Sequence, residues 1–217
     1  MRTKQETLQA VIDCGIVAIV RSESAEPVFK AIDAVLKGGI NIIEVTFTVP
    51  GALEIIRQLA KEIPDNVVLG AGTVLDARTA WEAINAGAEF IVSPSFNAEV
   101  VHTASSNGKA VMPGALTPTE VVTAWQAGAD LVKIFPITAM GPQYLKDLHG
   151  PLPQVKFIPT GGIDLSNAAD YIKAGASALG VGSSLVDKWL MGAGDWAALT
   201  ERARKFTEIV KEARGQK

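Results

Sequence analysis

Short apolar runs recur along the chain, each placed directly after a helical stretch that ends in glycine. The phrases KGGINIIEV, NAGAEFIVS, QAGADLVKI and KAGASALGV share this arrangement, and their anchor glycines are Gly39, Gly87, Gly128 and Gly175. Glycine can adopt the positive φ that ends a helix, and the apolar run that follows suits a strand buried on both faces. The pattern therefore predicts four helix-to-strand junctions.

Further apolar runs lie between these junctions. Successive anchor glycines are more than 40 residues apart, a spacing that suits two strand–helix units rather than one. Additional strands are predicted at 16–20, 67–72, 110–115 and 156–161, and a helical pattern follows each of them. The chain is therefore expected to hold eight strands that alternate with eight helices, preceded by an amphipathic helix within residues 1–15.

This alternation predicts an α/β fold, a (β/α)8 TIM barrel with an extra N-terminal helix. The 217 residues contain no Pro/Ser-rich linker and no long run of charge, so we expect one barrel domain over 1–217. A flavodoxin-like doubly wound sheet is the alternative fold, because it uses the same alternation of strands and helices.

Composition and charge narrow the class of ligand. The net charge is −3 and basic residues form no stripe, so no nucleic acid partner is expected. No apolar run approaches the roughly 20 residues that span a bilayer, and no secretory signal is visible, so we expect no membrane association and a cytoplasmic location. One cysteine and two histidines offer no metal-ligand spacing. We therefore expect neither metal nor cofactor, and small molecules as ligands.

The repeat also aligns two charged residues within the even strands. Five residues after the anchor glycines stand Glu44, Val92, Lys133 and Gly180. Alternate strands of such a barrel fill shared interior layers, so Glu44 and Lys133, on opposite strands, are expected to face each other. Burial favours the neutral amine of lysine, which is its nucleophilic form. The alternatives are a lysine turned outward to solvent and a structural ion pair with Glu44.

A set of motifs spans nearly the whole chain. In order they are GINIIEVTFTVP, GAGTVLD, FIVSPSF, PGALTPTE, LVKIFP, PTGGID and GVGSSL. This series resembles the 2-keto-3-deoxy-6-phosphogluconate aldolase family, which includes 2-keto-4-hydroxyglutarate and phosphogalactonate aldolases. The resemblance implies a metal-free class I aldolase in which Lys133 forms the Schiff base and Glu44 is the general acid/base. It also implies pyruvate and glyceraldehyde 3-phosphate as products, and a homotrimer.

Two glycine-rich loops form a candidate phosphate site. Gly161 and Gly162 follow the seventh strand, while Gly182 and Ser183 follow the eighth, and barrels commonly bind phosphate at these two places. Simple turns are the alternative interpretation.

The resemblance further implies a pyruvate pocket at the ends of several other strands. The residues at the family's positions are Thr73, Pro94, Phe135 and Thr160. Caps, turns and core packing are the alternative roles for these four residues.

One segment departs from the family pattern. Well-known members read Leu-Arg-Thr after the Glu-Val-Thr of the second strand, and that arginine binds the pyruvate carboxylate, whereas this chain has Thr48 and Val49 in the segment EVTFTVP. Arg21 ends the first strand, which neighbours the second in a barrel, and its guanidinium could form two hydrogen bonds to a carboxylate. We therefore predict that Arg21 binds substrate. A solvent-exposed arginine without a role is the alternative.

The expected partners are a small keto acid and a phosphosugar. The favoured reaction is cleavage of 2-keto-3-deoxy-6-phosphogluconate, with the phosphogalactonate analogue and 2-keto-4-hydroxyglutarate as alternative substrates. A non-catalytic phosphosugar-binding barrel is a rival function. A phosphosugar epimerase or isomerase is another, although its metal-dependent forms need His and Asp ligands that the strand ends here rarely offer.

Overall fold

The computed structural model describes residues 2–24 and 26–215. In chain order the elements are α1 (Lys4–Cys14), β1 (Ile16–Val20), α2 (Glu26–Lys37), β2 (Ile42–Thr46), α3 (Ala52–Glu62), β3 (Val68–Gly72), α4 (Ala77–Ala86), β4 (Phe90–Val92), α5 (Ala98–Ser106), β5 (Ala110–Met112), β6 (Gly114–Ala115), α6 (Pro118–Gln126), β7 (Val132–Ile134), α7 (Gly141–His149), β8 (Phe157–Pro159), α8 (Ala168–Lys173), β9 (Leu179–Val181), α9 (Lys188–Ala193) and α10 (Trp196–Ala213).

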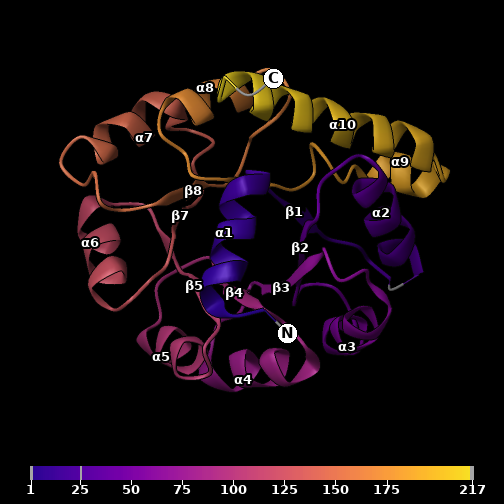
Figure 1. Ribbon diagram of the computed structural model, residues 1–217, viewed down its shortest axis with the longest axis horizontal. Helices are drawn as coiled ribbons and strands as arrows, with labels where there is room; N and C mark the ends of the chain where they lie inside the picture. Colours follow the sequence, from indigo (N-terminus) through magenta and orange to yellow (C-terminus); the bar gives the residue numbers. More distant parts are fainter. Residues whose placement is uncertain (1, 25, 216–217) are drawn as a thin grey trace.

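The strands form a parallel barrel with a ring of helices around it (Figure 1). The order β5-β4-β3-β2-β1-β9 makes up one part of the barrel wall and β6-β7-β8 makes up the other. Segments β5 and β6 are two parts of one strand, interrupted at Pro113, which has no N–H to donate to a neighbour. Isolated bridges at Phe157–Ala176 and Thr160–Gly180 connect β8 to β9. The predicted (β/α)8 barrel is therefore confirmed, and the doubly wound alternative is wrong.

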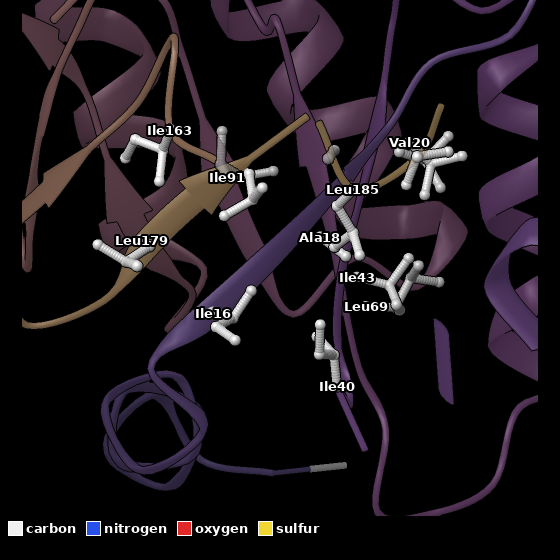
Figure 2. Close-up of a cluster of buried hydrophobic side chains, with 14 of the residues drawn as sticks. Ile16, Ala18, Val20, Ile40, Ile43, Leu69, Ile91, Ile163, Leu179 and Leu185 are labelled. Atoms are coloured by element: carbon white, nitrogen blue, oxygen red, sulfur yellow. The ribbon is translucent and has the colours of Figure 1, made fainter. Parts of the chain in front are cut away.

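Alternation along each strand divides the core into two apolar clusters. On β1, Ile16, Ala18 and Val20 belong to the larger cluster, which lies between the strands and the outer helices (Figure 2). Val17 belongs to the smaller cluster, which fills the barrel interior. Because both faces of the strands are buried, the strands read as nearly continuous apolar runs in the sequence.

Helix α1 closes the end of the barrel where the strands begin. Leu8 and Val11 of α1 pack into the interior cluster with the first residues of several strands, and α1 crosses the middle of the ring in Figure 1. Thr3 and Glu6 form a reciprocal capping box at its start. The opposite end of the barrel, where the strands stop, therefore holds the accessible loops.

One element was not predicted. The sequence pattern indicated a single helix after the last strand, whereas the structure has the short helix α9 followed by α10. Asp187 begins α9 by accepting hydrogen bonds from the backbone N–H groups of Trp189 and Leu190. Helix α10 then packs against α2 and α8 on the outside of the barrel.

Candidate active site

Lys133 and Glu44 both lie inside the barrel. Lys133 is in the middle of β7 and Glu44 in the middle of β2, and their side chains are only 3% and 2% exposed. The lysine is therefore not turned outward. Within the described chain no ion pair joins the two residues. Lys133 Nζ instead lies 5.1 Å from the centroid of the Phe135 ring.

Burial shifts both groups toward their neutral forms. The pKa of Lys133 is lowered from its ordinary value, mainly by desolvation and further by the charge of Arg21, while Glu44 acts in the opposite direction. The pKa of Glu44 is raised, again mainly by desolvation, with Lys133 and Arg21 opposing the shift. This arrangement favours a neutral, nucleophilic amine beside a carboxyl group that can exchange protons.

A glycine on the neighbouring strand makes room for the Glu44 carboxylate. A Cβ atom added at Gly72 on β3 would collide with Glu44 Oε1. That oxygen is buried and has no hydrogen-bond partner among the described residues. A buried acceptor of this kind is available to a donor on a substrate. Sequence reasoning missed Gly72, because a strand glycine more often marks a bulge or a weak point in the strand.

A cavity of about 170 Å³ opens among the loops that follow the strands. Seven of the predicted site residues line it: Arg21, Phe135, Thr160, Gly161, Gly162, Gly182 and Ser183. The cavity is also lined by Asp164 and Ser184, which were not predicted. Phe135 connects this cavity with the interior, since its ring lies beside Lys133 Nζ.

Backbone donors surround this cavity. The N–H groups of Gly162, Ile163, Ser183 and Ser184 have no acceptor within the described chain. Gly161 and Gly162 adopt φ of 103° and 67°, which only glycine takes readily. The carboxylate of Asp164 accepts hydrogen bonds from the backbone N–H and the hydroxyl of Ser166. Unpaired N–H groups of this kind are typical of an anion site.

Thr73 and Pro94 lie at the ends of two neighbouring strands, β3 and β4, outside the lining of the 170 Å³ cavity. The loops are joined where the N–H of Val74 donates to the carbonyl of Val92 at 3.1 Å. Thr73 has φ of 58°, and no other non-glycine residue of the described chain has a positive φ. For a β-branched residue this conformation is strained, and such strain is often found at functional sites.

Arg21 lines three neighbouring cavities at the end of β1. Besides the 170 Å³ cavity these are one of about 240 Å³ and one of about 330 Å³, and Thr48 and Lys188 also line the largest of the three. Within the described chain, no carboxylate pairs with its guanidinium. The hydroxyls of Thr46 and Thr48 form a hydrogen bond of 2.7 Å, in which either can be the donor. Thr46 is fully buried, and the sequence did not single it out.

Among the described residues, no cluster of His, Cys, Asp or Glu is arranged to hold a metal ion. No helix in the described part of the chain combines the length and the apolar character needed to cross a membrane.

Comparison with known proteins gives consistent matches. Residues 8–202 match the family described as KDPG and KHG aldolase. The chain is 37% identical to a 2-dehydro-3-deoxy-phosphogluconate aldolase of Treponema pallidum, over 97% of this chain and 99% of the relative. It is 34% identical to a 2-dehydro-3-deoxy-6-phosphogalactonate aldolase of Escherichia coli, over 78% and 83% of the two chains. A KDPG aldolase of Legionella pneumophila, solved with pyruvate captured as a covalent carbinolamine, superposes with a TM-score of 0.85 at 28% identity, covering 91% of this chain and 96% of that one.

Proposed function

The chain belongs to the KDPG and KHG aldolase family and is an aldolase, and from this premise we propose that it cleaves 2-keto-3-deoxy-6-phosphogluconate to pyruvate and glyceraldehyde 3-phosphate through a Schiff base on Lys133. The burial of Lys133 carries the proposal. An amine that is 3% exposed, has a lowered pKa and has no ion-pair partner in the described chain is available as a nucleophile.

The proposed cycle begins when the neutral Lys133 amine attacks the C2 ketone. Glu44 transfers protons as the resulting carbinolamine loses water and becomes an iminium. Deprotonation of the C4 hydroxyl then breaks the C3–C4 bond, and its electron pair moves into the iminium to give an enamine. The aldehyde is released at this step. Protonation of C3 and hydrolysis of the imine release pyruvate and restore the amine.

The phosphate end of the substrate fits the 170 Å³ cavity. Its unpaired N–H groups, from the loops after β8 and β9, could donate to phosphate oxygens. Phe135 and Thr160 line this cavity, and the Phe135 ring also lies beside Lys133 Nζ. Arg21 lines the same cavity, and we assign it the role of binding the substrate carboxylate.

Two further substrates are candidates because of what the relatives act on. The Escherichia coli relative at 34% identity is named for 6-phosphogalactonate, and another from that species is named a KHG/KDPG aldolase. The phosphogalactonate analogue keeps the phosphate and differs in stereochemistry, so it would use the same cavity. The hydroxyglutarate substrate would place a carboxylate there instead.

We also propose that the protein assembles as a homotrimer. Large apolar side chains are exposed outside the site, among them Leu75, Trp81 and Trp125. Trp81 lies on α4, Leu75 just before it, and Trp125 on α6. Exposed apolar groups of this size support a contact surface between copies of the chain.

The central experiment is trapping with borohydride in the presence of pyruvate. The wild-type protein is expected to gain one reduced pyruvate adduct, located on Lys133 by peptide mass mapping. Lys133→Ala is expected to gain none, whereas Lys30→Ala, which removes an exposed lysine of α2, should be trapped like wild type. Circular dichroism checks that the variants are folded. A wild-type protein that forms no adduct would overturn the proposal.

Kinetic comparison of the phosphogluconate, phosphogalactonate and hydroxyglutarate substrates then identifies the preferred one. We expect the highest kcat/KM for the phosphogluconate substrate. A higher value for either of the other two would replace it as the proposed substrate.

A further inference from the structure

Two side chains orient the peptide groups of the loop after β8. Asn167 Nδ2 donates to the carbonyl of Gly162 at 2.9 Å. Ser184 Oγ donates to the carbonyl of Ile163. Because the peptide unit is planar and trans, fixing the Gly162 carbonyl also fixes the Ile163 N–H in the opposite direction. Asn167 therefore sets the direction of the unpaired Ile163 N–H, and Ser184 holds the next peptide unit, whose N–H on Asp164 donates to Asn167 Oδ1 at 2.9 Å.

Ser184 links this loop to the loop after β9. While its hydroxyl reaches Ile163, its own carbonyl accepts a hydrogen bond of 3.3 Å from Arg202 Nη1. The N–H of the same peptide unit, on Leu185, donates to the carbonyl of Gly182 at 2.9 Å. Ser184 therefore joins the two candidate phosphate loops to each other. Arg202 in turn holds Ser184 by donating to its carbonyl.

Arg202 comes from the outer helix α10 and is itself anchored. Its Nη1 atom also contacts Asp187 Oδ2 at 3.0 Å, and both side chains are about a quarter to a third exposed. The other carboxylate oxygen of Asp187 begins α9. Hydrogen bonding to Arg202 lowers the pKa of Asp187, so this carboxylate stays charged at neutral pH. The bond is a charge-assisted one, and such bonds are stronger than neutral ones.

We propose that Arg202 is a positioning residue for the phosphate-binding loops, acting through Ser184 on the N–H donors without touching the substrate. This inference rests on the proposed function, because it assumes that the cavity receives the phosphate. Loss of Arg202 would leave the Ser184 carbonyl without its donor and release the loop after β9. The affinity for a phosphate group should fall, while chemistry at Lys133, deep in the barrel, should be retained.

The test compares Arg202→Met with Arg204→Met. Both arginines lie on α10, but among the described residues Arg204 pairs with Glu201 of its own helix and with no other carboxylate. For Arg202→Met we expect KM for the phosphorylated substrate, and the inhibition constant of inorganic phosphate, to rise by about five- to tenfold, as for loss of one hydrogen bond. Half-saturation of borohydride trapping by pyruvate should stay unchanged. Arg204→Met should behave like wild type, and Arg202→Lys should recover part of the loss.

Three outcomes separate the inference from the proposed function. If inorganic phosphate does not inhibit the wild-type protein, the phosphate site itself is wrong and the role of Arg202 fails with it. If phosphate inhibits wild type and Arg202→Met equally, only the role of Arg202 is overturned. If Arg202→Met weakens pyruvate trapping as much as phosphate inhibition, the residue supports the fold as a whole and the inference is also overturned.

Discussion

At residue 133 the charge state of one amine depends on two neighbours with opposite effects. Burial and Arg21 lower the pKa of Lys133, and Glu44 raises it. Removing the carboxylate removes a charge that stabilises the ammonium, so Glu44→Gln is expected to lower this pKa further. Removing the guanidinium in Arg21→Ala should raise it. These two substitutions therefore shift the same titration in opposite directions.

The measurement is the initial rate of borohydride trapping with pyruvate as a function of pH. The rate should rise with pH as the ammonium loses its proton, with a midpoint below that of an ordinary lysine. Glu44→Gln should move the midpoint to lower pH and Arg21→Ala to higher pH. The absolute rate of Glu44→Gln should also fall, roughly 10²-fold, because proton transfer is lost. Shifts of the same sign in both variants would contradict this account.

Gly72 determines where the Glu44 carboxylate can lie, since any side chain at that position would occupy the same space. We expect Gly72→Ala to displace the carboxylate and to lower kcat about 10²-fold, the loss typical of a misplaced proton-transfer group. Pyruvate trapping on Lys133 should remain. Gly192→Ala is the control, because a Cβ atom there meets nothing within 4 Å. An unchanged kcat in Gly72→Ala would show that Glu44 does not need this position.

The repeat alone made it possible to predict the orientation of Glu44 and Lys133. Glu44 and Lys133 stand at equal distances from anchor glycines, which was enough to predict that both point inward. No pattern in the sequence singles out Gly72 or Thr46. Both residues matter because of the neighbours that strand pairing brings beside them, in the β2–β3 and β1–β2 pairs. Contacts between strands depend on register and side-chain volume, which the order of residues along one strand does not contain.

Among the elements, β1 and β2 end side by side, and we expect Arg21 at the end of β1 to take the role of the arginine that the family pattern places after β2. The strands pair with Val20 opposite Val45, so Arg21 and Thr48 follow at the same edge and line one cavity of about 330 Å³. We expect Arg21→Ala to raise KM for the keto acid by about 10- to 100-fold, as for loss of a charge-assisted hydrogen bond worth ~1.5–3 kcal/mol. Adding Thr48→Arg should restore much of this loss by returning the charge from the neighbouring strand.

Measuring kcat and KM for the single and double variants tests whether an arginine at position 48 can substitute for the one at position 21. Thr48→Leu in the Arg21→Ala background is the matched control, since it adds volume without charge and should give no rescue. Unchanged keto acid kinetics in Arg21→Ala would indicate that backbone N–H groups near Thr73 bind the carboxylate instead. Rescue by leucine as well as by arginine would contradict the electrostatic explanation.

The elements themselves were predicted best where burial dictates the pattern. Strands of five residues buried on both faces, such as β1 and β2, read as apolar runs and were located from the sequence. The break between β5 and β6 was missed, because a proline inside an apolar run does not reveal that the two parts pair with different strands. Helix α9 was missed because six residues are too few to show a helical period.

For the whole molecule, two exposed tryptophans provide a test of the proposed trimer contact. Trp81 is 56% exposed on α4 and is part of the proposed trimer contact, while Trp189 is 88% exposed on α9. We expect Trp81→Lys to convert the trimer to monomer, because a charge would be buried at the contact without a partner. Trp189→Lys should leave the assembly intact. Light scattering after size-exclusion chromatography measures both masses, and an unchanged mass for Trp81→Lys would remove α4 from the interface.

Helix α1, with Leu8 and Val11 packed among the first residues of the strands, closes that end of the barrel. This closed end bears on the order in which the two products leave the barrel. In the proposed cycle the aldehyde half is free after cleavage and lies toward the open end, where the strands stop, while the three-carbon half is still attached to Lys133 inside the barrel. We therefore expect glyceraldehyde 3-phosphate to leave first and pyruvate last, and in the reverse direction we expect pyruvate to enter and react before the aldehyde. A barrel that is closed behind the lysine has the same end for entry and exit, and the covalent attachment of the three-carbon half would set the order in which the two products leave.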